Sequence, residues 1–367
     1  TTRSISAGGS FFLRNSDNTG SIIGNTSLTP GGDVTLLSSR TINLYDVTAT
    51  GGKLTATGGK ISLGLVVADA GVLLRTNPVA GLTGDINLRG AAISGVADFD
   101  ADASGLFSVN NVTAGRDILV RATGDVGFNT SGSTAGRNIS ISGATIFATN
   151  LEARTGFLSA TAGNRVSVSG GAKAGSYVLA TGRSVDLDLV TAGTGDITAT
   201  ATAGEATLKT ATAAGSILLS ATGGQAKLWG NVSAGGNLSV VGDGINVAGV
   251  AGRDIGPWLQ RAAGSVTYDG RTGSVSMSPQ GTVQSNSDGI GDEALTLQTS
   301  AGLDLWSTNF LGGTNRQSDV LFRYGAKRGV WLGGVTARSL QGAQGNAAFS
   351  SDIVVSGPWL VFNGNLD

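Results

Sequence analysis

A short strand-and-turn unit recurs along this 367-residue chain, and it constrains the fold more than any other feature. Between residues 190 and 250, runs of alternating polar and apolar residues begin about every ten residues, which leaves no room for a helix. These runs cover residues 197–200, 206–209, 217–220, 226–229 and 238–241. An internal period of this kind predicts an all-β repeat architecture.

A glycine followed by a polar residue precedes nearly every run. Gly32-Asp33 comes before Val34, and Gly84-Asp85 comes before Ile86. A tighter form, Ala-Gly-Arg followed by Asp or Asn and then Ile, occupies residues 114–118, 135–139 and 251–255. Because glycine tolerates a positive φ and Asn and Asp are the next most tolerant, these residues predict bends between strands.

An antiparallel sandwich or barrel and a parallel β-solenoid both accommodate strands at this spacing. The solenoid is favoured, because one kind of turn precedes nearly every strand, as expected when identical corners stack in register. Two runs then form one coil of about 20 residues, and the whole chain makes about 18 coils, or a rod on the order of 85 Å long. Ala, Val, Leu and Ile would fill its narrow core, with Thr, Ser and Asn outside.

Composition excludes several classes of function. The chain has 60 glycines, 13% charged residues and a formal net charge of −1, so no global field attracts nucleic acid or acidic lipid. It contains no His and no Cys, which excludes His-dependent triads, His metal sites and disulfides within this chain. No apolar stretch approaches the about 20 residues needed to span a bilayer, and Thr1-Thr2-Arg3-Ser4 does not begin like a signal peptide. We expect a mature or excised fragment.

The repeat units resemble those of filamentous haemagglutinin-like proteins. The resemblance rests on units such as Ala234-Gly235-Gly236-Asn237-Leu238-Ser239-Val240 and covers about residues 30–255. It implies a right-handed parallel β-helix, exported to the bacterial cell surface by an outer-membrane secretion partner or as an autotransporter-type passenger. Proteins of this kind serve as adhesins and surface fibres, and their repeats carry no active site. The Asn-Pro-Asn secretion motif is absent, so the resemblance implies an internal or distal part of the fibre.

The composition changes after residue 255. Four of the five Trp and three of the five Pro lie beyond it, and Gly-Pro-Trp-Leu at residues 256–259 returns at 357–360. A solenoid end exposes strand edges, so terminal segments usually cover it. We therefore expect a β-helix repeat domain over residues 1–255 and a less regular region of modified coils, a cap or a partner-contact region over 256–367.

Acidic side chains supply weak candidates for a site. In a strand, Asp98, Asp100 and Asp102 would all project from one face, where they could bind Ca²⁺ or supply acid and base for sugar cleavage; a solvated strand face is the alternative. Asp288 and Asp292 lie among glycines, as in a calcium loop, but without EF-hand spacing, and an acidic turn explains them as well. We expect no cofactor, with calcium as the weak exception.

Basic and aromatic residues mix in the C-terminal region. Trp306, Arg316, Arg323, Tyr324 and Trp331 could stack on sugars or contact an acidic polysaccharide, although Arg stems also cover apolar strands. The leading hypothesis is a non-enzymatic adhesive or structural surface protein that binds a host or cell-surface glycan or protein, or other copies of itself. A β-helix polysaccharide lyase or hydrolase and a surface-layer or filament scaffold are the alternatives.

Overall fold

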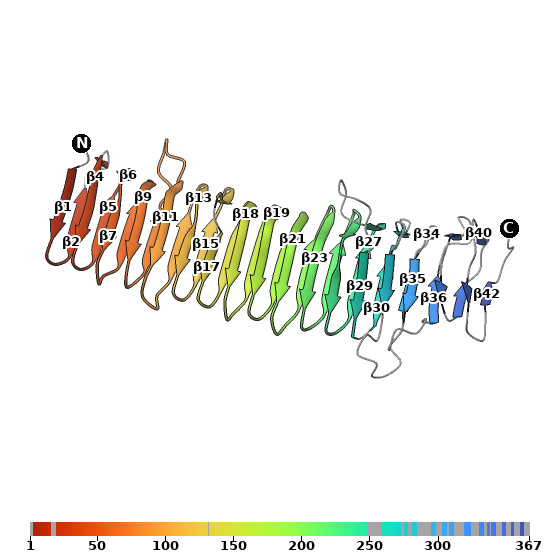
Figure 1. Cartoon of the computed structure of the whole chain (residues 1–367). Coiled ribbons are helices and arrows are strands. Elements are labelled where there is room, and N and C mark those ends of the chain that lie inside the picture. The colour runs from red at the N-terminus through yellow and green to blue at the C-terminus, as the bar shows by residue number, and fades with distance from the viewer. Residues whose placement is uncertain are drawn as a thin grey trace. The chain divides into compact units, whose positions relative to one another are not determined.

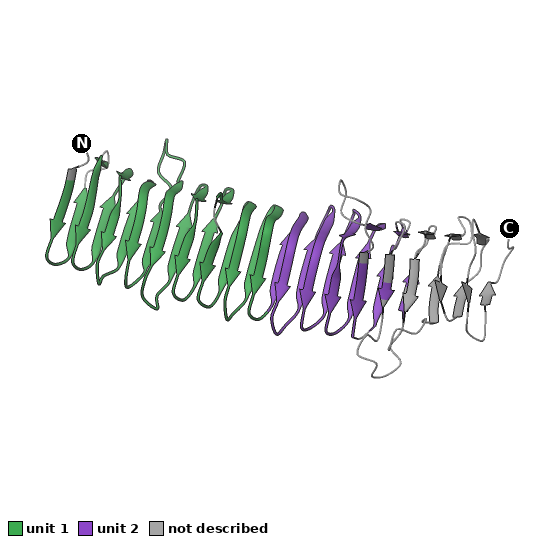
Figure 2. Cartoon of the chain, in the orientation of Figure 1, with its two compact units in different colours: residues 1–176 green, residues 177–367 purple. Residues whose placement is uncertain are grey.

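Parallel β-strands build the whole described structure. The structure is a computed structural model that describes residues 3–15, 20–130 and 132–248, and then the strands and a few short connections between residues 258 and 362. Every regular element in these ranges is a β-strand. The chain divides into two compact units, residues 1–176 and 177–367, and each is a parallel β-solenoid (Figure 2).

The strands follow one another with short connections (Figure 1). The first unit contains β1 (Arg3–Ala7), β2 (Phe11–Asn15), β3 (Ile22–Gly24), β4 (Thr26–Pro30), β5 (Val34–Ser38), β6 (Thr41–Leu44), β7 (Val47–Ala49), β8 (Leu54–Gly58), β9 (Lys60–Ala68), β10 (Val72–Thr76), β11 (Ile86–Ile93), β12 (Phe99–Ala103), β13 (Phe107–Val109), β14 (Val112–Ala114), β15 (Ile118–Ala122), β16 (Val126–Phe128), β17 (Ser133–Ala135), β18 (Ile139–Ala153) and β19 (Leu158–Ala174).

The second unit begins with strands of the same length and spacing. It contains β20 (Val178–Gly182), β21 (Ser184–Ala192), β22 (Ile197–Ala201), β23 (Ala206–Ala213), β24 (Ile217–Ala221), β25 (Ala226–Trp229), β26 (Val232–Ala234), β27 (Leu238–Gly242), β28 (Ile245–Ala248), β29 (Trp258–Ala262), β30 (Val266–Asp269), β31 (Val275–Met277), β32 (Gly281–Gln284), β33 (Leu295–Gln298), β34 (Leu303–Trp306), β35 (Thr308–Leu311), β36 (Asp319–Arg323), β37 (Val330–Gly333), β38 (Thr336–Ala337), β39 (Ser339–Gly342), β40 (Ala347–Phe349), β41 (Val354–Val355) and β42 (Leu360–Phe362).

Each coil contributes one strand to each of three parallel stacks. In one coil of the first unit these strands are β14 in stack A, β15 in stack B and β16 in stack C. On the next coil β14 pairs with β17, and β15 and β16 pair with successive parts of β18. The long strand β18 bends between stacks, because its residues 139–142, 146–148 and 151–153 extend stacks B, C and A in turn.

The coil length agrees with the sequence, but the number of strands per coil does not. Phe107 pairs with Val126 and Thr113 with Thr134, shifts of 19 and 21 residues, which confirms a coil of about 20 residues. The expectation of two runs per coil is wrong, since each coil has three strands. In the second unit the same cycle is β24 in stack B, β25 in stack C and β26 in stack A. The strand that the run spacing misses is the stack A strand β26, which is only three residues long.

The core lies between the three stacks. Side chains alternate along each strand, so Phe99, Ala101 and Ala103 of β12 are buried and Asp100 and Asp102 face outward. Phe99 and Phe107 pack edge to face within one coil, with ring centroids 6.0 Å apart. The second inward position of stack A is small, and on successive coils it holds Ala114, Ala135, Ala153 and Ala174. A narrow core of this kind explains the high Ala content.

Polar residues that precede several stack B strands have a structural role. The backbone N–H of Asp117 donates to the Asp98 carboxylate, that of Asn138 to Asp117, and that of Phe157 to Asn138, at 3.1, 3.0 and 3.0 Å. In the second unit, Ser216 N–H donates to Asp196 and Asn237 N–H to the Ser216 hydroxyl. We call this column the corner ladder. It supplies an acceptor for a backbone donor that the turn leaves unpaired.

Gly115 and Gly136, the glycines of the two described Ala-Gly-Arg turns, are required by close approach, and their φ values are not positive. A Cβ on Gly115 would lie 2.0 Å from the backbone oxygen of Gly95, and one on Gly136 would lie 2.1 Å from that of Gly115. Only glycine therefore lets the backbones of successive coils meet at this corner. The expected bend is present, but its physical reason differs from the expected one.

Beyond residue 258, the strands of the second unit keep the same parallel cycle. β29 pairs with β32, β30 with β33 and β31 with β34, and the strands β32–β42 continue this order. The stretch expected to hold the domain boundary, near residue 255, falls within residues 249–257, which lie outside the described residues. That boundary therefore stays a prediction.

Candidate functional site

The acidic cluster predicted from the sequence lies on stack B of the first unit. Asp100 and Asp102 face outward from β12, and Asp98 occupies the corner ladder just before this strand. On one side, Arg75 of β10 pairs in register with Asp102. On the other side, Arg121 of β15 also pairs in register with Asp102. The parallel register therefore places one arginine on the coil before the carboxylates and another on the coil after them.

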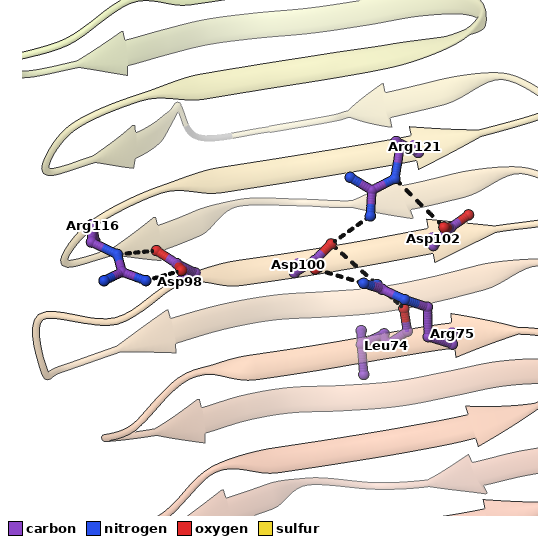
Figure 3. Close-up of polar contacts among 7 residues, drawn as sticks. All are labelled: Leu74, Arg75, Asp98, Asp100, Asp102, Arg116 and Arg121. Carbon is purple, nitrogen blue, oxygen red and sulfur yellow. Dashed lines mark hydrogen bonds and ion pairs between the residues drawn. The ribbon is translucent and has the colours of Figure 1, made fainter.

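The carboxylates of β12 form a network with those cations (Figure 3). Asp100 receives two hydrogen bonds from the Arg75 guanidinium, with Nη2 to Oδ2 at 2.6 Å and Nη1 to Oδ1 at 3.1 Å. Arg121 Nη2 donates to Asp100 Oδ1 at 3.1 Å, and its Nε lies 3.5 Å from Asp102 Oδ2. Asp100 thus bridges two arginines from the coils before and after it, and it is three-quarters buried.

Asp98 makes a separate pair at the corner. The guanidinium of Arg116, one coil later, binds both of its carboxylate oxygens, with Nε to Oδ1 at 2.7 Å. Hydrogen bonding from Arg116, with a smaller contribution from the backbone N–H of Asp117, lowers the pKa of Asp98. Arg137 lowers the pKa of Asp117 in the same way on the next coil. The Arg of the Ala-Gly-Arg turn therefore neutralises the corner-ladder carboxylate of the preceding coil.

This arrangement joins coils and does not present free carboxylates. A general acid for sugar cleavage needs a raised pKa, whereas the pKa of Asp98 is lowered. Within the described ranges, no group of three or more acidic side chains is placed to hold a metal ion. The network is suited to holding three successive coils in register by bidentate and bridging ion pairs.

A second acidic pair is also engaged by a cation. Asp186 and Asp188 project from β21, and the Lys209 ammonium group of the next coil binds Asp188. The pKa of Lys209 is raised, first by its hydrogen bond to Asp188 and then by the charges of Asp188 and Asp186. Inter-coil pairing thus recurs in the second unit, on stack C.

The C-terminal candidates are only partly placed. Asp288, Asp292, Arg316 and Tyr324 lie outside the described residues. Trp306 ends β34 and Trp331 lies in β37, and these strands are neighbours in which Trp306 pairs with Gly333 and Trp331 with Asp304. Arg323 ends β36 in another stack, where it pairs with Gln298. The backbone therefore brings the two tryptophans to adjacent strands and places Arg323 on a different stack.

Sequence reasoning missed a cluster at the corner that follows stack C of the first unit. The Arg89 guanidinium lies over the Tyr45 ring, 5.2 Å from its centroid, and Nη2 donates to Asp46 Oδ1 at 2.8 Å. Tyr45 follows β6 and Arg89 lies two coils later, with Gly64 on the coil between them. The pKa of Arg89 is raised, chiefly by its hydrogen bond with Tyr45 and then by Asp46.

No motif in the linear sequence connects these residues, because Tyr45 and Arg89 meet only through the coil register. The available signal was the glycine between them. A Cβ on Gly64 would lie 1.8 Å from the Tyr45 backbone oxygen, so this corner requires glycine and leaves room for Arg89 to reach back.

Comparisons of the sequence and structure with protein families, curated proteins and solved structures found no match. The described residues include no helix long and apolar enough to cross a membrane. The residues themselves are therefore the basis on which a function can be inferred.

Proposed function

We propose that this chain is a structural and adhesive segment of an exported bacterial surface fibre. It acts by presenting a long, repeated surface to a glycan or protein on another cell, or to other copies of itself. The observation that carries the proposal is that the charged side chains of stack B form ion pairs between neighbouring coils. Asp98, Asp100 and Asp102 are each bound by an arginine of a neighbouring coil, so they serve to hold coils together.

Two further features support a mechanical role. The corner ladder gives successive coils the same backbone-to-side-chain hydrogen bond, so each coil stabilises the folded state of its neighbours. Outward positions repeat at the strand spacing of about 4.8 Å, which suits weak contacts made many times. The polysaccharide lyase or hydrolase alternative needs unpaired carboxylates that converge with a base, and the described cluster does not offer them.

The proposal is tested with the purified chain bound covalently to fluorescent microspheres. We expect these microspheres to attach to cell monolayers or polysaccharide-coated surfaces more than albumin-coated ones do. We also expect no new reducing or unsaturated ends when the chain is incubated with soluble polysaccharides. Negative-stain electron microscopy at several concentrations tests self-assembly. Polysaccharide cleavage that is lost in the Asp100→Asn variant would overturn the proposal in favour of the enzyme. An absence of both attachment and assembly would also overturn the proposal.

A further inference from the structure

One coil of the first unit is longer than its neighbours. Val72 pairs with Phe99 after 27 residues, whereas Phe99 pairs with Ile118 after 19. Most of the additional residues form the connection between β10 and β11, residues 77–85, which projects from the unit (Figure 1). Asn77 N–H is anchored to the Gly58 backbone oxygen at 3.0 Å.

This connection borders the outer surface of stack C. The side chains of Val79 and Leu82 lie over Gly59, since a Cβ there would meet Leu82 Cδ1 at 2.6 Å and Val79 Cγ2 at 3.1 Å. Gly59 immediately precedes β9. The connection therefore lies beside the start of the stack C strand β9. Tyr45 and Arg89 lie at the opposite end of the stack C strands, at the corner that follows them.

Between these two borders lies a column of small polar side chains. Asn43, Ser62 and Asn87 face outward at the same register position on three successive coils. We call these residues, together with Tyr45, the amide patch. Asn43 and Asn87 are two coils apart, or about 9–10 Å at the usual strand spacing, which is too far for the amides to bond each other.

The hydrogen-bonding capacity of this column is not used inside the described structure. The side chains of Asn43, Ser62 and Asn87 have no hydrogen bond to another described residue, whereas Ser108, the next in the column, accepts from Asn129 Nδ2 at 2.9 Å. Each amide offers two donors and an acceptor, and the hydroxyl offers both kinds of group. The patch can therefore bind a ligand that has many donors and acceptors of its own.

Two of the three cations that flank the patch are paired, and Arg40, which directly precedes β6, has no ion pair with a described residue. Lys60 of β9 lies 3.7 Å from Asp85, and Arg89 of β11 binds Asp46. Tyr45 remains 45% exposed, and Leu65, which follows the Gly64 that faces Tyr45 on the next coil, is 40% exposed. Free amides, an exposed aromatic ring and largely compensated charge complement a neutral, hydroxyl-rich ligand. An acidic ligand would require several unpaired cations, and among the described residues that flank the patch only Arg40 is one.

We propose that the amide patch binds a neutral polysaccharide chain. The chain would lie along the coil stack, with its hydroxyl groups bonded to Asn43, Ser62 and Asn87 and the apolar face of one sugar ring against Tyr45. This inference rests on the proposed adhesive function and names the ligand class for it. The connection 77–85 would border the ligand on one side.

The test is a pull-down of the full chain on insoluble cellulose, chitin, starch and β-1,3-glucan, with pectate as the acidic comparison. We expect at least one neutral polysaccharide to retain the chain. The double variant Asn43→Ala/Asn87→Ala should bind that polysaccharide at least about tenfold more weakly, because it loses two hydrogen-bonding amides. Tyr45→Ala should also weaken binding, and Tyr45→Phe should restore most of it because the ring is kept.

Asn246→Ala is the matched control, since Asn246 faces outward from stack C on β28 in the second unit. It should bind like the unaltered chain, and circular dichroism should show all variants folded. The proposal is overturned by equal binding of the double variant, by retention on pectate alone, or by no retention on any neutral polysaccharide. In the last case, microspheres that still attach to cells leave the adhesive function standing, and microspheres that do not attach remove both.

Discussion

Asp117 and Arg137 join two successive coils through the same carboxylate that completes the corner ladder. Arg137 Nε donates to Asp117 Oδ1 at 2.8 Å, and the backbone N–H of Asn138 donates to the same oxygen at 3.0 Å. One side chain thus satisfies a backbone donor and neutralises a cation from the following coil. Successive turns of this kind supply both contacts, because the Arg of one turn binds the polar residue that ends the turn one coil earlier.

Replacing Asp117 by Ala should destabilise the first unit by about 1–2 kcal/mol, because the Asn138 N–H loses its acceptor and Arg137 loses its partner. Asp117→Asn should cost less, since an amide oxygen can still accept from the backbone and Asn138 already does so on the next coil. Urea unfolding measures both free energies of unfolding. Equal losses in the two variants would contradict the corner-ladder role.

Acid should weaken the first unit through Asp98 and Asp117. Hydrogen bonding from Arg116 and Arg137 holds both pKa values below the ordinary 3.8. A carboxyl with a lowered folded-state pKa contributes stability that is fully present above its unfolded value and is lost as the pH falls through the folded value. Urea midpoints should therefore fall as the pH decreases below about 4.

The double variant Asp98→Asn/Asp117→Asn is the control for this pH dependence. Its urea midpoint should change less between pH 5 and pH 2.5 than that of the unaltered chain, because two of the titrating groups are absent. An identical pH dependence in the two proteins would show that these corner pairs do not contribute.

Gly136→Ala should destabilise the first unit by about 2 kcal/mol or more, because the new Cβ would meet the Gly115 backbone oxygen, which cannot move without shifting a coil. Gly163→Ala is the matched control. Gly163 lies in β19, and a Cβ there would have the Ala144 backbone oxygen, at 3.8 Å, as its nearest neighbour, which is an ordinary contact. Thermal unfolding measures both, and similar midpoints would contradict the close approach of the corners.

Tyr268→Phe should stabilise the second unit by about 1–2 kcal/mol. The Tyr268 side chain is fully buried in β30, and its hydroxyl has no hydrogen-bond partner in the described structure. Phe keeps the ring and removes the unpaired polar group. Burial raises the pKa of Tyr268 well above its ordinary value, so its ultraviolet titration should appear only on unfolding. A Tyr268→Phe variant with a lower unfolding temperature would show that the hydroxyl has a partner in solution.

The sequence by itself determined the local geometry of the coil. The Gly-polar-aliphatic pattern predicted the strands, the parallel stacking and a coil of about 20 residues, because strand alternation and turn residues act over a few neighbouring positions. The sequence also indicated Asp98, Asp100 and Asp102 as a cluster. It missed the short stack A strands, such as β26, because three residues are too few to show a period.

Only the tertiary structure decided which side chains meet. Arg75 and Arg121 reach Asp100 from coils that lie 25 and 21 residues away, and Tyr45 meets Arg89 across Gly64. These contacts depend on the register between coils and on the longer connection at residues 77–85, and neither is encoded within a single repeat. The same physical rule explains both outcomes, since local pattern sets each strand, whereas the sum of all turn lengths sets which residues of successive coils lie side by side.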